Sequence, residues 1–226
     1  MYIHAQNNGQ KTGCTGPIKV CKDQALKLLS SYDAKLNKDN WPNADTIIDD
    51  ARRHAQEKAL TGAVWSDGRD TFKTELGNQT YYITEAEYFI LSAAERATLT
   101  DTSTKRYPGY CEFYLYDKNM HYVSSYAIKV GNGKAETHCN SIYGVSGVAF
   151  HGQPALLAIA QFFYTDVPAT SSIDQIGADY IRTAVLLPLA QQPDGTWIFT
   201  QDMTCFPLTN TIDNLAEARK RLENCR

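Results

Sequence analysis

Hydrophobic and polar positions alternate with different periods in different parts of this chain, and the first part has the period of helices. From Ile18 to Leu36 apolar residues recur every three to four positions, as on one face of an amphipathic helix. Pro17 suits the first turn of that helix. A second helix is predicted from Asp45 to Ala59, with acidic residues early and basic residues late, as the helix dipole favours. We therefore expect residues 1–60 to be helical.

Two further helices are predicted, one in the middle of the chain and one at its end. Thr84 and Glu87 have the spacing of a capping box, and the apolar residues behind them predict a helix over residues 85–97. The last helix is expected from Asp213 to Glu223, with Thr211 as its cap.

The rest of the chain has the short apolar runs and turn signals of β-strands. Asn132-Gly133 is the strongest two-residue hairpin signal, and Gly77-Asn78 and Pro193-Asp194-Gly195 are further turns. The predicted strands are Ala63–Ser66, Thr71–Leu76, Thr80–Ile83, Cys111–Asp117, His121–Val130, Lys134–Asn140, Tyr143–Phe150, Ala155–Tyr164, Tyr180–Ala190 and Thr196–Gln201.

These elements predict an α+β fold in a single domain over residues 1–226. The helical part, 1–60, precedes a mainly antiparallel β-sheet system over 61–210, which contains the helix at 85–97. A short C-terminal helix over 211–226 completes the fold. Apolar residues make up 43% of the chain and charged residues 21%, values that are ordinary for a globular protein.

Cysteine usage adds cross-links to this picture. The number of cysteines is even and none forms a CxxC pair, which favours three disulfides made outside the reducing cytosol. Structural zinc sites bring their ligands in closer pairs, so we predict no metal site. We predict no cofactor either, because no glycine-rich phosphate loop follows a strand. The six cysteines are Cys14, Cys21, Cys111, Cys139, Cys205 and Cys225.

Proximity along the chain suggests the pairs Cys14–Cys21 and Cys205–Cys225, and elimination leaves Cys111–Cys139. In a flat meander the last two cysteines would lie two strands apart, about 10 Å, and on opposite faces. A disulfide needs Cα atoms within roughly 7 Å. Either the strands divide between two sheets, or the cysteines pair differently.

Charge and hydropathy bear on location and partners. The net charge is −3 and the basic residues are scattered, so nucleic acid is not an expected partner. The longest apolar stretch, Pro154 to Tyr164, is too short to cross a bilayer. Met1 is followed by polar residues rather than by a signal peptide. Because the cysteines indicate an extracytoplasmic protein, periplasmic or secreted, we expect an export signal to have been removed.

Tyrosines supply the candidate contact surface, which we call the tyrosine face. If Asp117 faces His121 across a hairpin, Tyr116 lies opposite Tyr122, Tyr114 opposite Ser124, and Glu112 opposite Tyr126. Tyrosine is favoured at recognition surfaces, although these rings could instead pack under a helix or a second sheet. A slip of one residue would scatter the set. The predicted partner-binding residues are Tyr107, Tyr110, Glu112, Tyr114, Tyr116, Tyr122 and Tyr126.

No catalytic motif stands out, so whether the protein is an enzyme stays open, with a non-enzymatic role favoured. Ser146 lacks the GxSxG context of a nucleophile elbow. An exported hydrolase of cell-wall, carbohydrate or ester substrates would need Ser146, or a nearby acid, beside His121, His138 or His151.

The leading hypothesis is a non-enzymatic, extracytoplasmic module that binds another protein. One form of it is an inhibitor or immunity-type protein that blocks a secreted enzyme. The hydrolase is the first alternative, and a glycan or small-ligand binder that uses the tyrosine face is the second.

Overall fold

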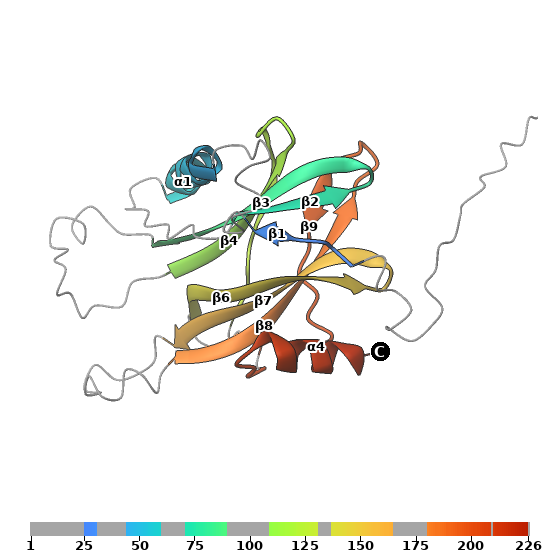
Figure 1. The fold of residues 1–226 in the computed structure, drawn as a ribbon. Coiled ribbons are helices and arrows are strands. Elements are labelled where there is room, and N and C mark those ends of the chain that lie inside the picture. The colour runs from blue at the N-terminus through green and yellow to red at the C-terminus, as the bar shows by residue number, and fades with distance from the viewer. Residues whose placement is uncertain are drawn as a thin grey trace, which may run out of the picture.

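The computed structural model describes residues 25–30, 44–59, 71–89, 109–130, 137–164, 180–208 and 210–225. Two β-sheets lie face to face, and one helix covers the outer side of each, which gives four layers (Figure 1). The elements are β1 Leu29–Ser30, α1 Ala44–Ala59, β2 Thr71–Leu76, β3 Gln79–Phe89, β4 Gly109–Asp117, β5 Tyr122–Ala127, β6 Thr137–Phe150, β7 Gln153–Tyr164, β8 Tyr180–Gln191, β9 Trp197–Phe199 and α4 Leu215–Glu223.

Both sheets are antiparallel, as the sequence predicted. The first has the strand order β1-β2-β3-β4-β5 and the second the order β6-β7-β8-β9. The predicted turn at Gly77-Asn78 joins β2 to β3, and both residues have positive φ, 57° and 73°. Positive φ at both central residues is the geometry of a type I′ turn, whose twist matches that of the strands it connects.

Alternating side chains fill the space between the sheets. Cys111, Phe113 and Leu115 of β4 face Leu156 and Ala158 of β7 within one apolar cluster. Because burying one large apolar side chain contributes about 1.5–3 kcal/mol, this cluster is the main source of stability. On the outer sides, α1 covers the first sheet with Ile47 and Ala51, and α4 covers the second with Ala218 and Leu222.

The disulfide between Cys111 and Cys139 joins the two sheets. Cys111 is on β4, Cys139 is on β6, and their Cα atoms are 5.6 Å apart. The strands therefore divide between two sheets, which is the arrangement that makes this bond possible. Cys205 and Cys225 are also bonded, which ties the end of α4 to the segment after β9. Both pairs confirm the prediction, while Cys14–Cys21 lies outside the described residues.

The predicted helix over residues 85–97 is wrong in its described part. Residues up to Phe89 belong to β3, which pairs with β4 from Tyr81↔Asp117 to Phe89↔Gly109. Polar and apolar residues alternate from Glu85 to Tyr88, as in a strand, but the capping-box spacing of Thr84 and Glu87 favoured a helix. Long-range pairing outweighed the local helix signal.

Of the two N-terminal helices predicted, the structure has one. The helix predicted at Asp45–Ala59 is α1, but Leu29–Ser30, inside the other predicted helix, form strand β1. The segment before β1 is held against the second sheet, where the Leu26 N–H donates to the Val148 carbonyl at 3.1 Å. Extended pairing with two sheets therefore replaces helical hydrogen bonds here. The remainder of that predicted helix lies outside the described residues.

Three smaller predictions also need correction. β5 and β6 lie in different sheets and do not form the hairpin expected around Asn132-Gly133, residues that are outside the described ranges. The two strands predicted between Lys134 and Phe150 are one strand, β6, interrupted by two bulges. The cap of α4 is Asn214, not Thr211, because the Asn214 side chain accepts from the Glu217 N–H at 2.9 Å.

Candidate protein-binding site

The β4–β5 hairpin carries most of the predicted tyrosine face, but its register differs from the predicted one beyond Tyr116. Tyr116 lies opposite Tyr122 as expected, and a bulge then shifts the pairing by one residue. Ser125, not Ser124, lies opposite Tyr114, and Ala127, not Tyr126, lies opposite Glu112. Tyr126 instead pairs with Phe113 and packs against the core between the sheets. The extra residue of the bulge has moved it to the other face.

Helix α1 covers the centre of the tyrosine face. Tyr114 and Tyr116 are both fully buried, and they pack with Ile47 and Ala51 of α1 in one apolar cluster. The alternative in which the rings lie under a helix therefore holds for these two tyrosines. They stabilise the fold and present no surface to a partner.

Glu112 forms a buried polar centre beside them. Its carboxylate accepts hydrogen bonds from the hydroxyls of Tyr114, at 2.7 Å, and Tyr88, at 3.1 Å. Burial, together with the charge of Glu112, raises the pKa of both tyrosines far above the ordinary value. Both hydroxyls therefore remain protonated donors. Tyr110 stacks on Tyr88 with ring centroids 5.4 Å apart and is 37% exposed.

Tyr122 is the other accessible tyrosine of the set, with 41% of its surface exposed. The centroid of its ring lies 4.3 Å from that of His54 on α1. The Nε2 atom of His54 is 3.2 Å from a carboxylate oxygen of Asp50. Burial alone would raise the pKa of Asp50, but hydrogen bonding to Arg53 and the other polar neighbours lowers it below its ordinary value. Of the seven predicted residues, only Tyr110 and Tyr122 are thus exposed among those described. Tyr107 lies outside the described residues.

The residues of the hydrolase alternative do not meet in the described part of the chain. Ser146 is on the outer side of the second sheet, where its hydroxyl is contacted by the Arg219 guanidinium of α4. His121 lies beside Asp117 in the β4–β5 turn, with 3.3 Å between ring nitrogen and carboxylate. His151 is exposed in the β6–β7 turn and packs on Phe150. Among the described side chains, no histidine hydrogen-bonds to Ser146.

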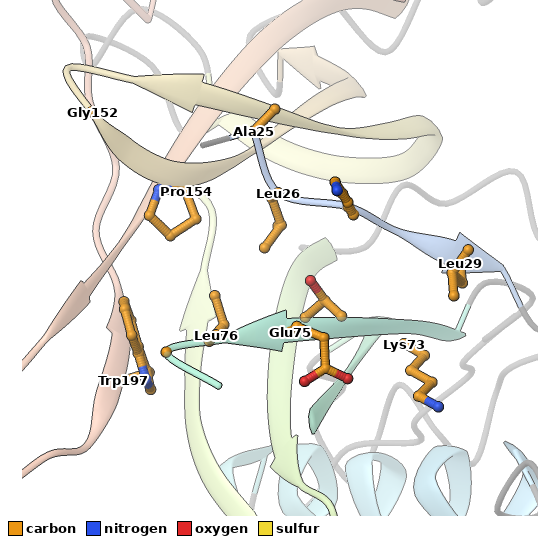
Figure 2. A pocket seen from close by; sticks show the side chains of 12 residues that line it. Ala25, Leu26, Leu29, Lys73, Glu75, Leu76, Gly152, Pro154 and Trp197 are labelled. Carbon is orange, nitrogen blue, oxygen red and sulfur yellow. The ribbon is translucent and has the colours of Figure 1, made fainter. Parts of the chain in front are cut away.

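A groove lies at the free edge of β2, and we call it the Trp197 groove. It has a volume of about 530 Å³. Figure 2 shows Leu26 and Pro154 on one side, Leu76 and Glu75 on the other, and Trp197 at one end. A second hollow, of about 710 Å³, is lined in part by the β2–β3 turn and shares Leu76, Gly77 and Trp197 with the groove. Trp197 therefore stands between two concave surfaces.

The groove exists because the chain before β1 changes sheets. Leu26 is bonded to β6, but Leu29 is already paired with Lys73 of β2. The close approach to β6 depends on Gly147, since a Cβ atom there would lie 1.7 Å from the Leu26 carbonyl oxygen. The diagonal path leaves Thr74–Leu76 without a described strand on their outer side, and the groove lies there.

Backbone geometry makes Glu75 the open position on this edge. Residues that flank a two-residue turn form a hydrogen-bonded pair, so Leu76 and Thr74 direct their N–H and C=O groups toward β3. The corresponding groups of Glu75 point away from β3, into the groove. No described residue hydrogen-bonds to them. Unpaired main-chain groups at a sheet edge are a template for another strand.

The groove was not predicted from the sequence. The turns on either side of it, Gly77-Asn78 and Pro193-Asp194-Gly195, were recognised, and a Trp soon after the second turn was the available signal. The open edge itself could not be foreseen, because residues 25–30 had been assigned to a helix.

Comparison of the chain with protein-family models, with curated proteins and with solved structures finds no match in any of the three. Within the described ranges, no helix has the length and apolar character needed to cross a membrane. The described side chains also contain no group of three or more His, Cys, Asp or Glu residues arranged to hold a metal ion.

Proposed function

We propose that this protein is a non-enzymatic, extracytoplasmic module that binds another protein through the Trp197 groove. The observation that carries the proposal is the groove itself, in which apolar walls lie beside main-chain groups that no described residue pairs with. An extracytoplasmic location is part of the proposal, and the two disulfides are compatible with it because such bonds persist in oxidising compartments.

Three features favour a protein as the partner. Trp197 is half-buried at the groove, and tryptophan is among the residues that contribute most to protein–protein affinity. The groove runs beside a sheet edge, which suits a polypeptide. A disulfide between the sheets limits rearrangement on binding, so less ordering has to accompany association. A rigid module of this kind suits the inhibitor or immunity-type role, in which the partner is a secreted enzyme.

The experiment is a capture of partners from the native extracytoplasmic fraction with three immobilised proteins. These are the unaltered protein, Trp197→Ala, and Tyr143→Ala as the matched control. Tyr143 is also an exposed aromatic residue, but it lies on β6 under the Arg182 guanidinium, away from the groove. We expect one protein to be retained by the unaltered and the Tyr143→Ala forms and lost with Trp197→Ala.

Two results would contradict the proposal. Equal retention by all three forms would remove the groove from binding. Glycan binding that depends on Trp197, in the absence of any protein partner, would favour the ligand-binding alternative.

A further inference from the structure

Resting on the proposed function, we propose that the Trp197 groove binds by strand addition. A short extended segment of the partner pairs with the main chain of Glu75, inserts an apolar side chain between Leu76 and Trp197, and places an acidic residue near Lys27 and Lys73.

The main chain supplies the first argument. In the described part of the chain, β1 pairs with Lys73 and Phe72. The next outward-facing residue of β2 is Glu75, and no described residue bonds to its N–H donor or C=O acceptor. An added strand would continue the row that β1 begins toward the β2–β3 turn. Extended peptides commonly bind in this way, with main-chain bonds for affinity and side-chain pockets for specificity.

The walls of the groove supply the second argument. Leu26 and Leu76 are buried core residues whose exposed edges reach the groove, and Pro154 and Trp197 are partly exposed there. Figure 2 shows the Leu76 and Trp197 side chains next to each other at the end of β2. Side chains alternate across a strand, so a peptide that pairs with Glu75 directs every second side chain inward between these walls.

Charge specifies the far end of the segment. Lys27 is exposed and Lys73 half-buried, and both line the groove near β1. Among the described residues of the lining, Glu75 is the one acid, and its carboxylate accepts from the Thr80 hydroxyl at 2.7 Å. The β1 end of the groove is therefore positive, which complements a carboxylate of the partner.

The space limits the length of pairing. Thr74–Leu76 is three residues, or about 10 Å of strand, between the end of β1 and the turn. Main-chain bonds at one residue add little affinity, so we expect the inserted side chain to dominate binding and the backbone to set its orientation.

The probe is a fluorescein-labelled octapeptide that alternates Val and Thr and carries Asp at one end, made in both chain directions. Fluorescence anisotropy with the full chain measures its affinity. We expect one of the two directions to bind, and Trp197→Ala to weaken that binding about thirtyfold or more. Replacing the peptide Asp by Lys should weaken it about two- to fivefold, with the difference reduced at high salt.

The backbone contact is tested with Glu75→Pro and Glu75→Ala. Both remove the carboxylate, but only proline removes the outward N–H, at an edge position that tolerates it. We expect Glu75→Pro to weaken peptide binding roughly three- to tenfold relative to Glu75→Ala. Because proline could disturb β2, peptides methylated at single backbone nitrogens give an independent test with the unaltered protein. In an added strand every second N–H faces β2, so we expect methylation to weaken binding at every second peptide position and to have little effect at the others.

Several results would overturn strand addition. No binding of either peptide at millimolar concentration, or equal affinities for Glu75→Pro and Glu75→Ala with no effect of methylation, overturns strand addition. If partner capture still depends on Trp197, the proposed function stands and only the binding mode fails. Concentration-dependent self-association that Trp197→Ala abolishes and that competes with the peptide would identify a second copy of this chain as the occupant of the groove and overturn the proposal. Tighter peptide binding after removal of residues 1–24 would point to competition from the chain itself, with the same consequence.

Discussion

The outer face of the first sheet and its β2 edge contrast sharply. The face holds the tyrosines that its composition marks as a recognition surface, yet α1 covers Tyr114 and Tyr116 completely. The edge holds no unusual residues, yet no described residue pairs with the main chain of Glu75, and Trp197 of β9 in the second sheet borders the groove beside it. Residue type alone therefore does not identify a binding surface, because the packing of neighbouring elements decides which groups stay accessible.

The largest expected effect tests the structural role of the face. Tyr114→Ala removes a fully buried ring, and we expect it to lower the free energy of unfolding by about 3–5 kcal/mol. If that variant does not fold, Tyr114→Phe removes only the hydroxyl that donates to Glu112 and should cost about 1–3 kcal/mol. Urea denaturation measures both. Tyr122→Ala, at the exposed rim, is the control and should cost less than about 1 kcal/mol. Equal losses at the two positions would contradict the burial of Tyr114.

The second prediction concerns the segment that leaves the edge open. Gly147→Ala places a Cβ against the Leu26 carbonyl, and we expect a loss of about 1–3 kcal/mol because the backbone of the segment must shift. Thermal unfolding measures the loss. The control is Ala149→Gly, a change of similar size on the same strand. Gly195→Ala is not suitable, because Gly195 has a φ of 89° and any other residue there is strained. A Gly147→Ala protein as stable as the unaltered one would mean that Leu26 does not lie against β6.

The third prediction separates stability from binding at the edge. Trp197 is only half-buried, so we expect Trp197→Ala to lower the free energy of unfolding by no more than about 1 kcal/mol. The same variant should abolish partner capture. Chemical denaturation and the capture assay give the two readouts. A variant that unfolds much more readily but still binds, once folded, would reverse the roles assigned to face and edge.

The smallest expected effect is a pH dependence at α1. Because the folded pKa of Asp50 is lowered, its carboxylate contributes stability that is fully present above its ordinary pKa of 3.8 and is lost as pH falls through the lowered value. We expect Asp50→Asn to reduce stability at pH 6 and to have less effect at pH 2, measured by urea denaturation. Asp49→Asn, its more exposed neighbour on the helix, is the control. A loss independent of pH would contradict a role for the charge.

Strong local patterns made part of the fold predictable. The period of α1, the turn at Gly77-Asn78 and the spacing of Cys205 and Cys225 all gave correct elements or cross-links. The conflict between a flat meander and the Cys111–Cys139 bond correctly raised the possibility of two sheets. For the helix and the turn, short-range sequence determines the outcome.

The errors have long-range causes. In β3 the capping-box spacing of Thr84 and Glu87 indicated a helix, but pairing with β4 along Tyr81–Phe89 makes the segment a strand. The bulge that moves Tyr126 to the inner face has no signal in the hairpin sequence. The burial of Tyr114 depends on the docking of α1, and the open edge at Glu75 depends on the path from β6 to β2. The site was therefore less predictable than the fold, since it follows from contacts between distant segments.

Amide hydrogen exchange at Glu75, followed by NMR with and without the octapeptide, tests the central claim most directly. In the free protein we expect the Glu75 amide to exchange quickly, while the amides of Thr74 and Leu76, which bond to β3, exchange slowly. Binding should slow the Glu75 amide to the range of its neighbours. A Glu75 amide that is already protected in the free protein, or one that stays fast when the peptide is bound, would contradict the open edge as the binding site.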